Sequence, residues 1–206
     1  LYERGVRNFV VSELPENMDH YENTNFLQVP HPLKALQRLV EKYRLQFDVP
    51  VIGVTGSNGK TVVKEWLYQL LSPERIITRS PRSYNSQIGV PLSVWLMNDK
   101  TELGIFEAGI SEMGEMEALQ SIIRPTVGIL TNIGGAHQEN FYSTSEKCME
   151  KLLLFKDCDV VVYDGDNEMI SSCVSKCLFG AREIAWSKVD NERPLYIESI
   201  KKGDTS

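Results

Sequence analysis

The 206-residue sequence has little of several features that mark specialised protein classes. Its four cysteines form no CxxC pair, so the spacing of a zinc site is absent. No apolar run approaches the ~20 residues that a membrane-spanning helix needs. The first eleven residues mix acidic and basic side chains and have no small-residue cleavage site, unlike a signal peptide. We therefore expect a cytoplasmic protein with reduced thiols.

Positive charge is also scarce. Lys and Arg number 22 against 28 Asp and Glu, a net charge of −6, and there is no run of basic residues. Such a chain is a poor candidate for binding nucleic acid or an anionic membrane, and an anionic substrate would need local positive contacts. Hydrophobic residues make up 42% of the chain, which predicts a packed core. The sequence has no initial Met and ends in a polar stretch, so we expect a piece of a longer protein.

From residue 49 the sequence alternates between strand-like and helix-like segments, which predicts an α/β fold with a parallel sheet covered by helices on both faces. The expected strands are 49–54, 76–78, 103–106, 127–130, 160–163 and 183–186. The expected helices are 60–71, 88–97, 113–123, 144–155 and 168–178.

The first 48 residues have a different pattern. Short strands are expected at 9–11 and 26–29, followed by a helix over 33–47. We place a domain boundary near Asp48, so that residues 1–48 form the tail of a preceding domain plus a connecting helix. Residues 49–206 then form the central domain.

A glycine-rich loop joins the first expected strand of the central domain to the first helix. Its residues are Thr55, Gly56, Ser57, Asn58, Gly59, Lys60 and Thr61. Gly56 and Gly59 allow the backbone N–H groups to approach phosphate oxygens. Lys60 would reach the β- and γ-phosphates, and the Thr61 hydroxyl would bind Mg²⁺. The usual Walker spacing would put glycine at the position of Val54. We nevertheless interpret the loop as a P-loop that binds a nucleoside triphosphate, rather than an ordinary strand-to-helix turn.

Polar residues follow three further expected strands. They are Glu107; Asn132, with His137 and Glu139 soon after; and Asp166 with Asn167. The carboxyl ends of parallel strands meet at one edge of a sheet, where ligands bind. Glu107 is placed there to bind Mg²⁺ or to orient a water molecule.

Other residues have simpler interpretations from pattern alone. Lys151 and Lys64 are expected on solvated helix faces, and a lone loop histidine such as His137 is more often structural. Residues Met113, Met116 and Leu119 recur at helical spacing and are expected in the core.

Several motifs together resemble the Mur ligase family, the ATP-dependent amide-forming enzymes of peptidoglycan synthesis. The motifs are GVTGSNGKTVVKE at 53–65, YNSQIGVP at 84–91, EAG at 107–109, TNIGGAHQE at 131–139 and DGDN at 164–167. The run from Asn85 to Pro91 and the AHxE element are similar to the branch that adds D-alanyl-D-alanine to UDP-N-acetylmuramoyl-tripeptide. The chain also resembles the form of that branch fused to an alanine racemase.

The resemblance implies a set of ligands for ATP and two Mg²⁺ ions. Thr61 and Glu107 would bind one ion. His137 and Lys151, the latter carbamylated by CO₂, would bind the other. Asn132, Asp166 and Asn167 would lie on the nucleotide side. Asn85 and Ser86 would contact the peptide substrate, although this branch often has a second Asn in place of Ser86.

The resemblance also implies a reaction and a domain plan. ATP would phosphorylate the substrate carboxylate, and D-alanyl-D-alanine would attack the acyl phosphate. Residues 1–48 would belong to the UDP-substrate-binding N-terminal domain. Residues 49–206 would be a truncated ATP-binding domain, and with the C-terminal domain missing we expect no activity from the chain alone. The alternatives are another ligase of the superfamily, such as a folylpolyglutamate synthase, a P-loop phosphotransferase or nucleotide switch, and a non-catalytic nucleotide-binding module.

Overall fold

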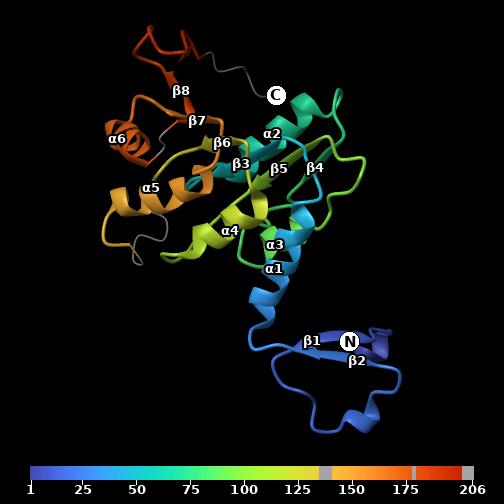
Figure 1. Cartoon of the computed structure of the whole chain (residues 1–206). Coiled ribbons are helices and arrows are strands. Elements are labelled where there is room, and N and C mark those ends of the chain that lie inside the picture. The colour runs from blue at the N-terminus through green and yellow to red at the C-terminus, as the bar shows by residue number, and fades with distance from the viewer. Residues whose placement is uncertain (135–140, 178–179, 201–206) are drawn as a thin grey trace, which may run out of the picture.

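A parallel sheet forms the centre of the computed structural model, which describes residues 1–134, 141–177 and 180–200. Its seven strands have the order β4-β5-β3-β6-β7-β8-β9. Figure 1 labels the strands from β3 to β8. The strands are β3 (Val51–Thr55), β4 (Ile77–Arg79), β5 (Leu103–Glu107), β6 (Val127–Leu130), β7 (Val160–Asp164), β8 (Arg182–Ser187) and β9 (Leu195–Tyr196). Every pair of neighbours is parallel, as the alternation of strands and helices predicts.

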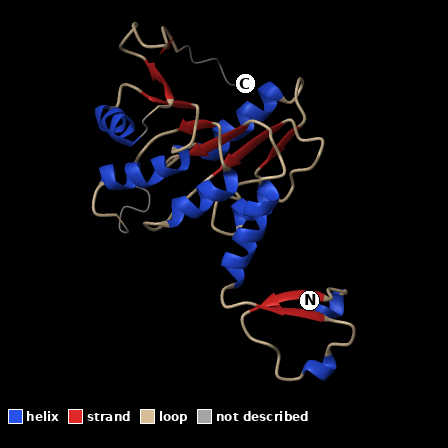
Figure 2. Ribbon diagram, viewed as in Figure 1, coloured by secondary structure: helices blue, strands red, loops and turns tan. Residues whose placement is uncertain are grey.

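Helices connect the strands and cover the sheet (Figure 2). They are α2 (Lys60–Leu71), α3 (Gly89–Val94), α4 (Glu115–Ile123), α5 (Thr144–Leu152) with the 3₁₀ turn η4 (Leu153–Phe155), and α6 (Glu168–Cys177). Helix α2 contacts β3, β4 and β5, whereas α3 packs with α4, and α5 packs with α6. The predicted α/β class is confirmed.

Strand β3 is the point where the order of the strands reverses. The chain runs outward from β3 to β4 and returns to β5, beside β3, before it crosses to β6 on the other side. Val54 of β3 is paired with Glu107 of β5 and with Ile129 of β6. Such a reversal leaves a crevice beyond the carboxyl end of the central strand. The glycine-rich loop begins at this end.

The N-terminal residues form a separate small sheet. Strands β1 (Asn8–Val11) and β2 (Asn25–Gln28) pair in parallel, flanked by the turns η1 (Tyr2–Arg4) and η2 (Met18–His20). Helix α1 (Pro32–Arg44) links this sheet to the large one and packs on α3 and α4 (Figure 1). The Tyr43 hydroxyl donates to the Met97 carbonyl at 2.5 Å. The domain boundary near Asp48 stays a prediction.

Several element ends differ from the sequence predictions. Helix α4 begins at Glu115 rather than at 113, because Gly114 takes a left-handed conformation with φ of 82°. Met113 therefore lies outside the helix and is 47% exposed, so its expected place in the core was wrong. Met116 and Leu119 are buried as predicted. Helix α3 is shorter than expected, and β9 was not predicted. Within the described ranges, no helix is long and apolar enough to cross a membrane.

Candidate active site

The glycine-rich loop is fixed tightly against the end of β6. Gly56 has φ of 141°, and a Cβ there would lie 2.0 Å from the Thr131 Oγ1 atom and 2.9 Å from the Asn132 carbonyl oxygen. The Ser57 amide donates to that carbonyl at 2.8 Å, and the Asn58 amide donates to the Asn132 side-chain oxygen at 2.9 Å. Asn132 therefore holds the loop in shape. Only glycine fits this approach at position 56.

Lys60 and Thr61 occupy the first turn of α2. The Lys60 ammonium donates to the carbonyl oxygens of Gly56 at 2.9 Å and Ser57 at 3.3 Å. Its side chain therefore folds back onto the glycine-rich loop. Burial lowers the pKa of Lys60, and the nearby Glu107 carboxylate partly opposes that shift. The Thr61 hydroxyl donates to Glu107 Oε2 at 2.9 Å. The structure thus brings together the loop lysine, a hydroxyl and a carboxylate, as the motif predicts.

Glu107 ends β5 and is fully buried. Its backbone amide donates to the Ser80 hydroxyl at 3.2 Å. Its second carboxylate oxygen, Oε1, lies 3.4 Å from the Lys64 Nζ atom. Lys64 is also fully buried, so its expected place on a solvated face was wrong. The only sequence signal was its position one helical turn after Lys60, which does not by itself predict burial.

A cavity of about 140 Å³ lies beside the loop. Its lining residues are Gly56, Ser57, Lys60, Asn85, Ser86, Gly109, Ile110, Ser111, Lys147 and Lys151. Three of them are lysines and none is a carboxylate, so the cavity favours an anion. Lys147, which the sequence analysis did not select, donates to the Gly134 carbonyl at 2.7 Å. It lies one helical turn before Lys151 on α5, and that spacing places both side chains on the same face.

Lys151 is only 3% exposed, and its pattern-based interpretation as a solvated residue was wrong. Burial is the main cause that lowers the pKa of Lys151 to about 8, and the positive charges of Lys60 and Lys147 contribute to the same shift. A lysine with such a pKa is partly neutral near physiological pH. Its amine is then able to act as a nucleophile or to react with CO₂.

The remaining candidates lie in different places. Asn85 and Ser86 line the cavity, and the Asn85 carbonyl accepts from the Gly109 amide at 2.7 Å. Asp166 accepts from the Lys188 amide at 2.8 Å, and Asn167 caps α6 through the Ile170 amide. Neither of these two lines the cavity, and their predicted contact with the nucleotide stays a prediction.

His137 and Glu139 lie outside the described residues. Among the residues that the structure does describe, no group of three His, Cys, Asp or Glu side chains is placed to bind a metal ion. The Thr61 hydroxyl and the Glu107 carboxylate nevertheless supply oxygen ligands of the kind that Mg²⁺ prefers, next to a phosphate-binding loop. The chemistry of this pair would suit one magnesium ion.

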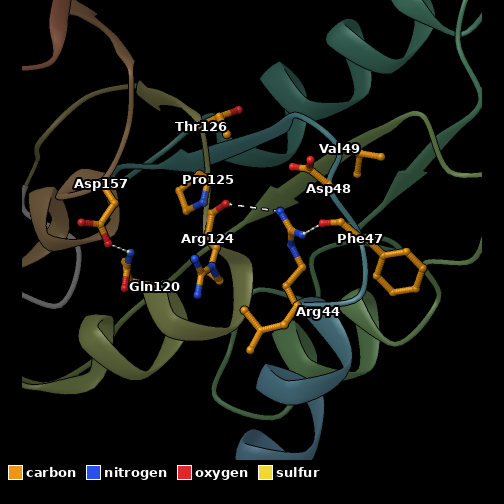
Figure 3. A pocket seen from close by; sticks show the side chains of 10 residues that line it. Arg44, Phe47, Asp48, Val49, Gln120, Arg124, Pro125, Thr126 and Asp157 are labelled. Atoms are coloured by element: carbon orange, nitrogen blue, oxygen red, sulfur yellow. Dashed lines mark hydrogen bonds between the residues drawn. The ribbon is translucent and has the colours of Figure 1, made fainter.

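A larger cavity, about 380 Å³, lies near the amino ends of the central strands. Figure 3 shows the side chains that line it. It is lined by the end of α1 and by the segments that precede β3, β6 and β7. Several of its polar side chains already have partners. Arg44 donates to the Phe47 carbonyl at 2.6 Å and to the Arg124 carbonyl at 3.4 Å, and Gln120 donates to Asp157 at 2.8 Å (Figure 3). Size alone does not make it the site, because neither the glycine-rich loop nor Glu107 lines it.

The sheet order and the glycine-rich loop define a P-loop nucleotide-binding domain of the α/β class. Residues 54–194 match the Mur ligase middle domain. The chain belongs to the Mur ligase family.

Two curated relatives extend the match. The UDP-N-acetylmuramoyl-tripeptide–D-alanyl-D-alanine ligase of Bacillus subtilis is 33% identical over 157 residues, which cover 75% of this chain and 34% of the relative. The ligase of the same name from Borreliella burgdorferi is 34% identical over 180 residues, covering 84% and 38%. The chain thus spans little more than a third of the length of these relatives.

A solved structure has a similar fold. The crystal structure of the MurF ligase from Thermotoga maritima in complex with ADP superposes with a TM-score of 0.78 at 25% identity. The superposition covers 91% of this chain and 49% of that one.

Proposed function

We propose that this chain is the nucleotide-binding part of an ATP-dependent ligase that joins D-alanyl-D-alanine to UDP-N-acetylmuramoyl-tripeptide. The observation that carries the proposal is the contact between Thr61 of the P-loop and the buried carboxylate of Glu107. The two curated relatives that bear this activity in their names support the choice of substrates. In the proposal, the other domains of a longer chain supply the remaining substrate contacts, so the chain alone binds nucleotide and does not ligate.

Each part of the site has a distinct task in this proposal. Bound ATP supplies the phosphoryl group that turns the substrate carboxylate into an acyl phosphate with a good leaving group. The loop amides and Lys60 hold and neutralise the phosphates, and Thr61 with Glu107 holds Mg²⁺. The cavity with its three lysines lies next to the loop and receives the carboxylate end of the peptide, with Asn85 at its wall.

We further propose that Lys151 is carbamylated and, with His137, holds a second Mg²⁺. The lowered pKa of Lys151 supports this because CO₂ reacts with a neutral amine. The amine nitrogen forms a bond to the carbon of CO₂ and releases one proton, which leaves a carbamate with one negative charge. A carbamate would attract a cation that the ammonium form repels. Carbon-13 NMR of the chain in labelled bicarbonate should show a carbamate signal that is absent in Lys151→Met.

The proposed reaction is tested with a protein that includes the other domains. ADP release should require both UDP-N-acetylmuramoyl-tripeptide and D-alanyl-D-alanine, and hydroxylamine should trap the acyl phosphate. Release that instead depends on a folate and glutamate would assign the protein to the folylpolyglutamate branch. Phosphate transfer to a hydroxyl acceptor with no trapped acyl group would indicate a phosphotransferase.

A further inference from the structure

Lys64 lies at the centre of a buried polar cluster behind the P-loop. Its side chain is fully buried. The Nζ atom donates to the Ser80 carbonyl at 2.8 Å and also to the Arg82 carbonyl, and it lies 3.2 Å from a carboxylate oxygen of Glu65. Its fourth neighbour is Glu107 Oε1 at 3.4 Å. A lysine is rarely buried to this degree unless its charge is paired.

The two oxygens of Glu107 have separate partners. Oε2 accepts the hydroxyl of Thr61, on the P-loop side, while Oε1 points to Lys64. Because both oxygens have a partner, rotation of the carboxylate out of its plane would break the contact with Thr61 and the contact with Lys64. Lys64 therefore helps to fix the orientation in which Glu107 faces the phosphate loop.

The same ammonium also anchors the segment between β4 and α3. Its acceptors at Ser80 and Arg82 are backbone carbonyls, and Arg82 has a left-handed φ of 49°. Asn85, which lines the cavity, follows three residues later and is held by the Gly109 amide at 2.7 Å. One side chain thus connects the carboxylate at the end of β5 to the segment that forms the cavity wall.

We propose that Lys64 is the positioning residue for Glu107 and sets the affinity of the site for Mg²⁺ with bound nucleotide. This proposal rests on the proposed function, since it assumes that Glu107 binds the ion. Lys64 itself is too enclosed to touch nucleotide or substrate. Partners that orient a metal ligand typically change metal affinity by about 10–100-fold when they are replaced.

The test compares binding of a non-hydrolysable ATP analogue to this chain by calorimetry, in EDTA and across a Mg²⁺ titration. Lys64→Gln keeps N–H donors for the two carbonyls but removes the charge that faces Glu107. Lys64→Met removes both. Lys176→Gln, at an exposed lysine of α6, is the matched control.

We expect Lys64→Gln to bind the analogue in EDTA as the unchanged chain does, while the Mg²⁺ concentration for half-maximal enhancement rises about 10–100-fold. Lys64→Met should show the same loss, and Lys176→Gln should show none. If Lys64→Met does not fold, Lys64→Gln decides the matter. A normal Mg²⁺ requirement in Lys64→Gln contradicts the proposal, and so does an equal loss of binding in EDTA, which would indicate a general structural role.

The outcome for the unchanged chain separates the two proposals. If that chain binds no ATP analogue, or binds it without any effect of Mg²⁺, the proposed function is refuted, and the role of Lys64, which rests on it, is refuted as well. If it binds with a clear Mg²⁺ effect that Lys64→Gln leaves intact, the proposed function stands and the role of Lys64 is refuted.

Discussion

Replacing Gly56 with alanine would disturb the P-loop at its closest approach to the rest of the sheet. The added Cβ would lie 2.0 Å from Thr131 Oγ1, and 2.9 and 3.0 Å from the carbonyl oxygen and amide nitrogen of Asn132. The side chain of Thr131 can rotate away, but the two backbone atoms of Asn132, just after β6, have no such freedom, and its carbonyl is bonded to the Ser57 amide. The loop must therefore move away from the end of that strand.

The size of the effect follows from two contributions. A non-glycine residue at φ of 141° is strained by about 1–3 kcal/mol. Displacing close-packed neighbours adds about 1–3 kcal/mol. The native loop conformation is then disfavoured by at least about 2 kcal/mol, which corresponds to a loss of nucleotide affinity of about 30-fold or more.

Calorimetry with an ATP analogue and Mg²⁺ measures this loss. Gly114→Ala is the control, because Gly114 also has positive φ, 82°, but no atom lies within 4 Å of its Cβ position. The control should lose stability by roughly 1–2 kcal/mol from backbone strain alone and keep its affinity. If Gly56→Ala binds the analogue as tightly as the control does, the loop geometry described above does not hold the phosphates.

Three further predictions concern residues around the site and the opposite cavity. Well below pH 8 Lys151 is charged in both the folded and the unfolded chain. Its folded pKa of about 8 lies below the ordinary 10.5, so its contribution to the free energy of unfolding should rise between these two pH values; Lys151→Met should make the free energy of unfolding rise less, or fall more, over this range than in the unchanged chain, in denaturant titrations. Glu107→Gln should remove the Mg²⁺-dependent part of analogue binding and leave binding in EDTA unchanged; retention of the Mg²⁺ effect would exclude Glu107 as a ligand. Arg44→Met leaves buried carbonyls without a donor, so it should lower the free energy of unfolding by about 3 kcal/mol while analogue affinity stays the same; reduced affinity would show that the larger cavity contributes to the site.

Sequence patterns predicted the order of strands and helices and the edge where the polar residues gather. That success has a physical basis, because parallel strands place all their carboxyl ends on one side. The P-loop and Glu107 could thus be expected to lie close together from the sequence. The structure places them in contact through Thr61, while their role in a nucleotide site stays a prediction.

The surroundings of the lysines could not be predicted in the same way. Lys64 is buried because acceptors 16 and 18 residues further along the chain, at Ser80 and Arg82, close over it. Lys147 and Lys151 face the cavity because α5 crosses close to the P-loop. Helical periodicity identifies which residues share a face, but it does not reveal what that face meets. Met113 was expected to be buried but is exposed. Gly114 has a left-handed conformation, so helix α4 begins after Met113.

The most direct test is a crystal structure of the chain with an ATP analogue and Mg²⁺. The account predicts phosphates over the loop from Gly56 to Thr61, with Mg²⁺ bound to the Thr61 hydroxyl and the Glu107 carboxylate. A nucleotide bound instead in the cavity beside Arg44, or a metal ion that does not contact Glu107, would contradict it.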